Sequence, residues 1–332
     1  MTQIINRDMI DAAAQCIANG GTVAFPTETV YGLGCDALNN IAIDKVYKAK
    51  GRPSDNPLIV HVADKDDIFQ LAKEVSNDAK KLIEKFWPGP LTVVLPKKPS
   101  VPIRVTGGLD TVAIRCPSDP VARELISKSG RFIAAPSANL SGSPSPTTSQ
   151  HVIDDLDGRV DYILCGDNSK IGLESTVIDM SGKSPVILRP GAITLEMISE
   201  VLDNVSYDAC IDAGVDKPKC PGMKYKHYSP KADVEVVMGE GMDVKRYIES
   251  KLCLDANCGV LSFFGHDYDN AVCVLRAGNN MSEYASGLFY NLRVFDEYKV
   301  DRIYAEFCRE DGLGTAVANR LFKAAGTNIT EV

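Results

Sequence analysis

Apolar residues between positions 9 and 17 recur at the spacing of one helical face, and Gly20 follows as the expected end of that helix. The apolar run at 22–26 then has the composition of a buried strand. The chain is therefore predicted to begin with a helix followed by a strand.

The same alternation continues over the first two hundred residues. Apolar runs of strand length occur at 57–62, 91–96, 111–116, 132–136, 160–165, 175–180 and 185–189. Helical spacing occurs near 40–50, 64–85, 119–128 and 194–203. We therefore predict a mixed α/β domain over residues 1–205.

The periodic pattern disappears between 206 and 232, which we interpret as a linker. Within it, the segment 217–230 combines prolines with lysines and aromatic rings, unlike a plain Gly/Ser spacer. Rings among lysines can cover a bound anion or base, so one interpretation is a strap that closes over a ligand. An extended strap packed on the surface is an equally good interpretation.

From residue 233 the pattern resumes and predicts a smaller α/β domain over 233–332. Strand-like runs occur at 234–238, 258–263, 271–275 and 301–305, with helical stretches at 242–254 and 281–298. This order favours a three-layer arrangement. Gly312 and Gly314 open a further helix, but without the full fingerprint they are weak evidence for a dinucleotide site.

The composition narrows the class of protein. The chain has 332 residues, 45% of them hydrophobic, and a net charge of −8, which argues against a large sequence-independent nucleic-acid footprint. Its ten cysteines include no C-x-x-C pair and are interpreted as reduced core residues. Without a recognisable signal peptide or membrane-spanning run, the protein is expected in the cytoplasm.

A basic turn is the first candidate for chemistry. Lys48, Lys50 and Arg52 gather around Gly51, just before the predicted strand at 57–62. Glycine permits a close backbone approach and arginine offers a planar fork of donors, which together favour a small anionic substrate. The alternative is that the lysines form the solvated end of the preceding helix, where cations stabilise the helix dipole.

Turns rich in hydroxyl groups and glycine adjoin three predicted strands, at 26–34, 137–143 and 174–176. Open α/β sheets place their ligands at strand ends of this kind. Such turns can donate to phosphate oxygens or orient a zwitterion, although turn formation and helix capping are their ordinary roles.

Three residues within apolar runs have side chains that need polar partners. Arg115 and Arg189 would each require an anion if buried. That anion is either a substrate carboxylate or phosphate, or a structural partner such as Glu28 or Glu174. His61 is most simply a core residue, but it follows the basic turn closely enough to reach a substrate hydroxyl.

Familiar catalytic motifs are missing. The sequence lacks the G-x-x-x-x-G-K-[ST] phosphate loop, the G-x-S-x-G elbow and the H-E-x-x-H zinc motif. It has four histidines and no carboxylate cluster that would identify a metal cage. No metal ligand is therefore predicted among the protein side chains.

Six longer motifs, taken together, resemble the YrdC-like domain of threonylcarbamoyl-AMP synthases. They are the segments 25–34, 48–53, 56–58, 86–92, 135–142 and 174–179. They follow one another in the family's order and span nearly all of residues 8–205. The segments 221–230 and 312–325 further resemble the longer, two-domain form of this family.

The resemblance implies a fold and an activity. The fold is a twisted, mixed, open sheet with helices around a concave basic cavity, a linker crossing the active site, and a smaller Rossmann-like three-layer α/β domain. The activity joins L-threonine and bicarbonate into a carbamate, which attacks the α-phosphate of ATP to give threonylcarbamoyl-AMP and pyrophosphate. This product serves the N6-threonylcarbamoyladenosine modification of tRNA, whose transfer step belongs to a separate system.

The resemblance also assigns site residues. Lys50 and Arg52, in the family's Lys-x-Arg motif, are the expected catalytic residues. The residues expected to bind ATP are Lys50, Arg52, Asn56, Thr111, Ser137, Asn139, Ser145, Arg189 and Tyr225, the last as part of a lid. Those expected to hold threonine are Thr29, His61, Arg115, Ser175 and Ala135, the last through its backbone. Mg²⁺ is expected to bridge the phosphates through water and substrate oxygens.

Two other classes of function remain open from the residues. One is an RNA-binding module, including binding of double-stranded RNA or of tRNA, which the acidic composition disfavours. The other is a sensor that binds ATP without turnover, for which Lys50 and Arg52 would serve equally well. No membrane partner is expected.

Overall fold

The computed structural model describes residues 1–208 and 228–332, and it divides the chain into two compact units. The first unit contains most of residues 1–208. The second contains residues 228–332 together with the short segments Gly142–Pro144 and Ile171–Leu173. Within these described ranges, no helix is both long and apolar enough to cross a membrane.

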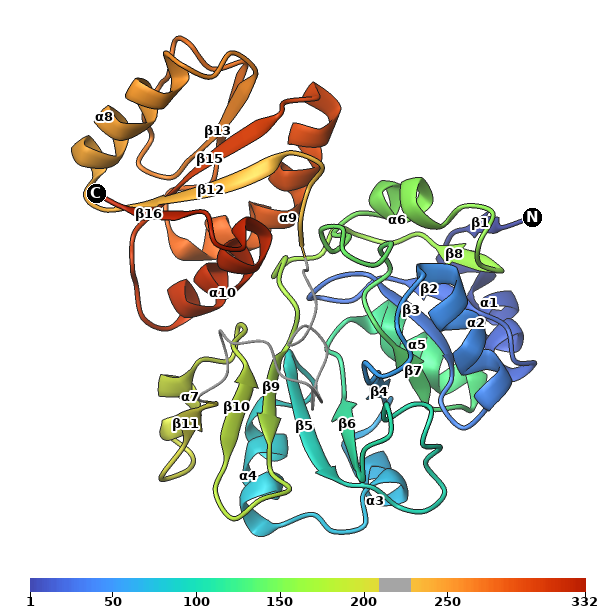
Figure 1. The fold of residues 1–332 in the computed structure, drawn as a ribbon. Helices are drawn as coiled ribbons and strands as arrows, with labels where there is room; N and C mark the ends of the chain where they lie inside the picture. The colour runs from blue at the N-terminus through green and yellow to red at the C-terminus, as the bar shows by residue number, and fades with distance from the viewer. Residues whose placement is uncertain (209–227) are drawn as a thin grey trace. The chain divides into compact units, whose positions relative to one another are not determined.

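A mixed sheet of eleven strands forms the first unit (Figure 1). Its strands, in spatial order, are β1 (Gln3–Ile5), β8 (Tyr162–Leu164), β2 (Val23–Phe25), β3 (Gly32–Asp36), β7 (Ile133–Ala135), β4 (Ile59–His61), β6 (Thr111–Arg115), β5 (Leu91–Pro96), β9 (Thr176–Asp179), β10 (Val186–Arg189) and β11 (Ser206–Tyr207). The sheet contains both parallel pairs, such as β4 with β6, and antiparallel pairs, such as β6 with β5. The expected mixed open sheet is confirmed.

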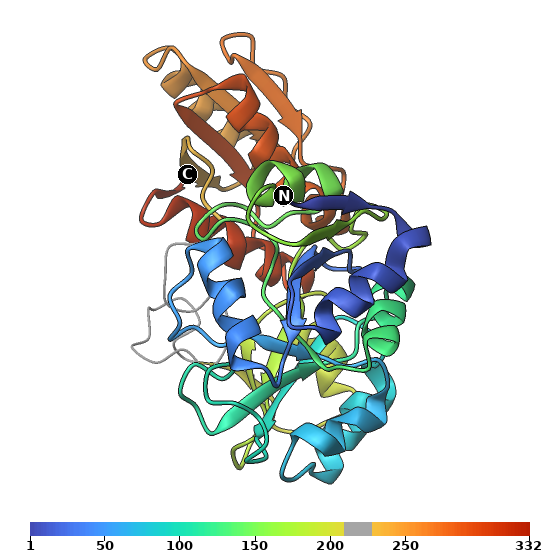
Figure 2. The same ribbon diagram turned by 90° about the vertical axis from the view of Figure 1, so that its right-hand side faces the viewer.

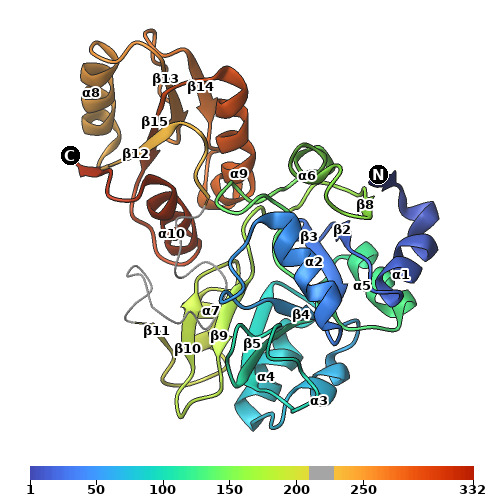
Figure 3. The same cartoon turned by 45° about the vertical axis from the view of Figure 1, so that its right-hand side comes forward.

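Seven α-helices are described in this unit, and they divide between the two faces of the sheet. They are α1 (Ile10–Ala18), α2 (Asn40–Lys50), α3 (Ile68–Leu71), α4 (Asn77–Phe86), α5 (Pro120–Ser129), α6 (Ser149–Leu156) and α7 (Leu195–Ser199). Residues of α2, α3, α4, α6 and α7 share the larger apolar core, whereas α1 and α5 build a second core with β2 and β7. Figure 2 shows α1 and α5 packed side by side, and Figure 3 shows α2 along the sheet beside β3.

The alternation of side chains along the central strands assigns a face to the predicted site residues that lie in those strands. In β6, Val112 and Ile114 point into the larger core, so Thr111, Ala113 and Arg115 lie on the opposite face. The same rule places His61 and Ala135 on that opposite face, because Val60 and Ala134 belong to the larger core.

The part of this opposite face formed by β4, β6, β5, β9 and β10 carries a small apolar cluster made from strand residues. Among the residues described in the first unit, no helix contributes to that cluster. The face is therefore available to carry polar side chains.

Most predicted elements of the first unit are confirmed within about two residues, and one is wrong. The expected helix at 64–85 is interrupted, because α3 ends where Ala72 becomes extended and pairs with Lys97. A new helix, α4, starts after Ser76, whose side chain accepts a hydrogen bond from the Ala79 amide at 3.2 Å. The helical spacing continues across this break, so periodicity did not reveal it.

The second unit contains a parallel five-stranded sheet, as expected for a Rossmann-like domain. Its strands, in spatial order, are β14 (Cys273–Arg276), β13 (Cys258–Ser262), β15 (Arg302–Phe307), β12 (Asp233–Met238) and β16 (Ile329–Glu331). Its helices are α8 (Gly241–Leu252), α9 (Met281–Tyr298) and α10 (Leu313–Ala325). Figure 1 shows α8 on one side of the sheet and α9 and α10 on the other, which gives three layers.

A fully buried carboxylate organises one end of this second sheet. Glu306 in β15 accepts hydrogen bonds from the amides of residues 263–264, from Ser262, from the Nδ1 atom of His266 and from the Tyr268 hydroxyl. It thus holds the whole loop that follows β13.

Replacing Glu306 by alanine should lower the free energy of unfolding by about 3–5 kcal/mol, because several buried donors would lose their acceptor. Urea denaturation of the full chain measures this. The exposed Glu297, on α9, supplies the control Glu297→Ala, which should change the unfolding free energy little. Equal effects of the two substitutions would contradict the organising role of Glu306.

Candidate functional site

The three cations of the basic turn, Lys48, Lys50 and Arg52, differ in how deeply they are buried. Helix α2 is capped at its start by Asn39 and ends before Gly51, whose φ of 63° lies in the left-handed region. Lys50 is 2% exposed and Arg52 is 8% exposed, whereas Lys48 lies on the surface. Lys48 therefore fits a solvated helix end, and Lys50 and Arg52 do not.

Lys50 contacts residues that are distant in sequence, and Arg52 contacts the segment that follows the turn. The Lys50 ammonium donates to the backbone carbonyls of Ser137 and Asn139 and, at 3.3 Å, to the Oδ1 atom of Asn139. Arg52 donates to the carbonyl of Pro57 at 3.2 Å. We call Lys50, Arg52, Asn56, Ser137 and Asn139 the cationic cluster.

Asn56 and the Ser-x-Asn segment supply the polar atoms of the cationic cluster. Asn56 is 1% exposed, and its Oδ1 atom has no hydrogen-bond partner among the described residues. The Ser137 hydroxyl donates to Asn139 Oδ1 at 2.5 Å. Buried cations and an unpaired buried amide oxygen within one short segment of chain are typical of a binding site that a polar ligand completes.

A second group surrounds Arg115 at the end of β6. The guanidinium lies 2.6 Å from Glu28 Oε1, donates to Thr29 Oγ1 at 2.8 Å and to the carbonyl of Gly89 at 3.3 Å. His61 is its partner in register on β4. We call Glu28, Thr29, His61 and Arg115 the arginine cluster.

Burial and neighbouring charge set the protonation of the arginine cluster. Burial raises the pKa of Glu28, but the adjacent Arg115 and the Ser118 amide outweigh it and hold this pKa below its usual value. Burial, assisted by Arg115, lowers the pKa of His61 to about 3. At neutral pH the cluster therefore combines a guanidinium, a carboxylate and a neutral imidazole.

The low pKa of His61 predicts an acid-dependent loss of stability. Because the folded pKa lies below the unfolded value of 6.5, the unfolded state binds a proton first as the pH falls. Relative to His61→Gln, the wild type should lose about 2–3 kcal/mol of unfolding free energy between pH 7 and pH 4.5. Urea titrations of both proteins at the two pH values measure this, and parallel losses would contradict it.

Ser175 and Arg189 lie at the same edge of the sheet as Arg115. The starts of β5 and β9 pair in parallel there, and the end of β6 is antiparallel to the start of β5. Arg189 donates to the carbonyl and hydroxyl of Ser175 at 3.1 and 3.2 Å, and Thr92 lies 2.7 Å from the same hydroxyl. A third polar group therefore continues from the arginine cluster.

The segment 26–34, a loop that runs into β3, connects the two clusters. Thr29 in this loop accepts from Arg115, and the carbonyl of Tyr31 accepts from the Ala138 amide at 2.8 Å. Gly32 also forms a β-bridge with Ser137. Two polar turns that the sequence places a hundred residues apart are thus side by side.

Several sequence predictions now have a defined place. Arg115 does form the ion pair with Glu28 that was the structural alternative, while Glu174 accepts from the Ser145 hydroxyl. Thr111 lies at the opposite end of β6 from Arg115 and is half-buried. Tyr225 falls outside the described residues.

Sequence reasoning missed the place of Glu28 and Thr92 in the site. Glu28 entered the sequence analysis as a structural ion-pair partner. Thr92 is a polar residue in an otherwise apolar strand, 91–96, which is a weak signal for a side chain directed away from the core.

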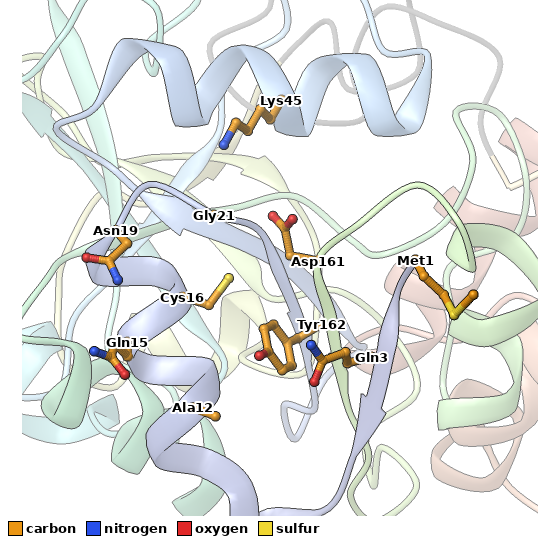
Figure 4. Close-up of a pocket in the computed structure, with 10 residues that line it drawn as sticks. All are labelled: Met1, Gln3, Ala12, Gln15, Cys16, Asn19, Gly21, Lys45, Asp161 and Tyr162. Atoms are coloured by element: carbon orange, nitrogen blue, oxygen red, sulfur yellow. The ribbon is translucent and has the colours of Figure 1, made fainter.

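A separate pocket of about 460 Å³ lies near the N-terminus and involves none of the predicted site residues (Figure 4). Its two charged side chains are already engaged: Lys45 donates to the carbonyl of Gly20 at 2.8 Å, and Asp161 accepts from the amide and hydroxyl of Thr22. Burial, followed by the influence of Asp161, raises the pKa of the Cys16 thiol to about 11. The pocket therefore offers no reactive thiolate at neutral pH.

Comparison with known proteins gives consistent matches over the whole chain. The family model described as "Telomere recombination" matches residues 15–191, and the model "Threonylcarbamoyl-AMP synthase, C-terminal domain" matches residues 193–326. The threonylcarbamoyl-AMP synthase of Pyrococcus abyssi is 47% identical over 100% of both chains, and that of Bacillus subtilis is 46% identical over 98% of this chain and 95% of its own.

A solved structure is similar as well. It is P. abyssi Sua5 complexed with L-threonine, with a TM-score of 0.96 and 46% identity over 100% of both chains. The similarity in sequence and in structure therefore extends over both units.

Proposed function

Because this chain belongs to the threonylcarbamoyl-AMP synthase family, we propose that its two clusters bind the two substrates of one reaction, ATP and threonine. The chain is an enzyme that forms threonylcarbamoyl-AMP, the first step of N6-threonylcarbamoyladenosine modification of tRNA. The substrates proposed are L-threonine, bicarbonate and ATP. The observation that carries the proposal is the pair of buried clusters joined by the segment 26–34.

The cationic cluster is proposed to bind the phosphates of ATP. Lys50 and Arg52 provide two buried positive charges, and Ser137 and Asn139 provide a hydroxyl and an amide beside them. Arginine and lysine so placed stabilise the charge that develops at phosphorus. Lys50 also fixes the Ser-x-Asn segment, so its ammonium has both a structural and an electrostatic role.

The arginine cluster and its neighbours are proposed to bind threonine. Arg115 suits the α-carboxylate, because a guanidinium pairs well with a carboxylate. Thr29, His61 and Ser175 lie around it on adjoining elements, and Ala135 offers backbone groups at the end of β7. P. abyssi Sua5 was solved as a complex with L-threonine, which supports an amino-acid site in this chain.

The reaction needs positioning more than a protein nucleophile. The threonine ammonium group and bicarbonate give a carbamate, water and a proton. A carbamate oxygen then forms a bond to the α-phosphorus while the bond to the β-phosphate oxygen breaks, which releases pyrophosphate. Holding both partners in line accounts for much of the rate enhancement, and the buried cations neutralise charge at phosphorus.

The remaining ATP contacts are proposals from the family resemblance. They are Thr111, Ser145 and Arg189, together with Tyr225 as part of a lid that would exclude water. Mg²⁺ would accompany ATP, bound mainly by phosphate oxygens and water. Residues 1–208 and 228–332 contain no group of three or more His, Cys, Asp or Glu side chains that could hold a metal ion.

We also propose how the product is passed on and whether the chain contacts tRNA. The labile product would pass to a tRNA-modifying transferase system, and a direct contact with tRNA would be weak because the chain carries a net charge of −8. We place the reaction in the cytoplasm.

Single-turnover measurement of pyrophosphate tests the proposed function. With threonine, bicarbonate and Mg-ATP, release should depend on both threonine and bicarbonate. A protein that retains ATP but releases no pyrophosphate would instead be a sensor. Tight tRNA binding with a steep salt dependence, without threonine-dependent release, would favour an RNA-binding module.

A further inference from the structure

Glu28 has a buried oxygen that no described residue satisfies. Its side chain is 9% exposed, and its Oε1 atom faces Arg115 and accepts from the Ser118 amide at 3.1 Å. The other oxygen, Oε2, has no hydrogen-bond partner among the described residues. A buried acceptor left in this state is unfavourable by about 1–3 kcal/mol, and more when it is charged.

The neighbouring guanidinium has a hydrogen-bond donor that no described residue satisfies. Arg115 Nη2 lies 2.6 Å from Glu28 Oε1 as an ion pair, yet Nη2 makes no hydrogen bond of acceptable geometry among the described residues. An unsatisfied donor and an unsatisfied acceptor are therefore adjacent within the arginine cluster. Such pairs of unsatisfied groups need a chemical explanation.

An α-amino acid satisfies both atoms at once. Its carboxylate accepts from a guanidinium and its ammonium donates to a carboxylate, and the two groups are attached to the same carbon. Because a zwitterion adds no net charge, its binding beside a buried ion pair avoids the penalty of an uncompensated buried charge.

We propose that Glu28 is a substrate-binding residue that holds the nitrogen of threonine through Oε2, while Arg115 Nη2 binds the carboxylate. This assignment rests on the proposed function and extends it by naming the group that recognises the amine. Its structural surroundings agree, because Thr29 follows Glu28 in the chain and is itself hydrogen-bonded to Arg115.

The charges around Glu28 suit this role. Arg115 faces it directly, the neutral His61 lies on the adjoining strand, and Asp119 follows the Ser118 amide that Glu28 accepts from. Burial raises the pKa of Asp119, so Asp119 loses its proton less readily than Glu28 does. Glu28 thus remains anionic and can attract an ammonium group.

The same contact orients the next intermediate. When the ammonium and bicarbonate combine, a carbamate, water and one proton result, and the nitrogen keeps one N–H bond. Glu28 Oε2 accepts that N–H, and like-charge repulsion turns the new carbamate oxygens away from Glu28. In this way the residue directs the nucleophile without becoming covalently attached.

Binding of two ligands distinguishes this role from a purely structural one. Isothermal titration calorimetry on the full chain would compare L-threonine with (R)-3-hydroxybutanoate, which keeps the carboxylate, hydroxyl and methyl groups but lacks the amine. In Glu28→Gln, threonine affinity should fall roughly tenfold to a hundredfold, with the hydroxybutanoate affinity changed by less than about threefold.

Glu124 is half-buried and pairs with the exposed Arg7, away from the arginine cluster. It supplies the control Glu124→Gln, in which both affinities should stay unchanged. Equal weakening of both ligands in Glu28→Gln would assign Glu28 a structural role, and no weakening would remove it from the site. If Glu28→Gln fails to fold, Glu28→Asp is used instead, because it keeps the charge on a shorter side chain. This variant should still bind threonine more tightly than hydroxybutanoate, but by a smaller factor than the wild type. An unchanged factor would overturn the proposal. Wild-type pyrophosphate release is measured separately, so failure of the proposed function is recognised independently.

Discussion

Replacing Arg52 by alanine should reduce the formation of threonylcarbamoyl-AMP on the order of 10²–10³-fold, as expected when one stabilising donor is removed from a transition state. Arg52 is 8% exposed and lies in the cationic cluster beside Lys50. Loss of a group that acts on the developing charge lowers kcat and kcat/KM together. Steady-state pyrophosphate release at saturating threonine measures both.

Lys48→Ala is the matched control for Arg52→Ala. Lys48 stands on the same turn with the same sign of charge, but it is exposed. It should keep turnover within about threefold of wild type, because screened surface charges contribute little. Equal losses in the two variants would show that the turn acts through general positive potential, and full activity of Arg52→Ala would remove Arg52 from the phosphate site.

Replacing Arg115 by methionine should have the second large effect, on stability and on threonine binding together. Methionine roughly keeps the length of the side chain but leaves Glu28 as an unpaired buried carboxylate. Breaking a buried ion pair in this way destabilises by about 3–5 kcal/mol. Threonine binding should be lost as well, because its carboxylate would have no guanidinium.

The double variant Arg115→Met with Glu28→Gln separates the two consequences. Without either charge, the unfolding free energy should recover most of the loss, since neutral replacement of a buried pair is often tolerated. Threonine binding should remain absent. A surface pair, Arg7 with Glu124, gives the comparison, and Arg7→Met should change stability by less than about 1 kcal/mol. If the double variant were no more stable than Arg115→Met, the buried pair would not explain the loss.

The sequence predicted the elements that carry the site, because local signals determine them. The helix at 40–50 has a capping asparagine before it and Gly51 after it, and both appear in the structure. The strands at 91–96 and 111–115 begin where their apolar runs begin. These features depend on residues within a few positions of each other.

The difference in burial between Lys50 and Lys48 was not predictable from local sequence. Both are lysines in one helix, and their burial depends on the segment 137–139, which β7 brings beside the helix end. The role of Glu28 was hidden for the same reason, since its partner Arg115 is distant in the chain. Charge pairs of this kind are set by tertiary structure.

The pairing of the strands could not be predicted from local sequence either. The strand β8 lies between β1 and β2, and β9 pairs with β5, although each pair joins segments that are far apart in sequence. The strand β3 was missed because its residues, 32–36, include two glycines and read as a continuation of a polar turn. The family resemblance supplied the mixed sheet that periodicity alone did not.

The central claim is that the two clusters hold threonine and ATP so that bicarbonate carbon ends in a mixed anhydride with AMP. Incubation of the full chain with ¹³C-bicarbonate, L-threonine and Mg-ATP, followed by mass spectrometry, tests it most directly. The account predicts threonylcarbamoyl-AMP carrying one labelled carbon, with an equal amount of pyrophosphate. Pyrophosphate released without labelled adenylate, or threonyl-AMP without the added carbon, would contradict it.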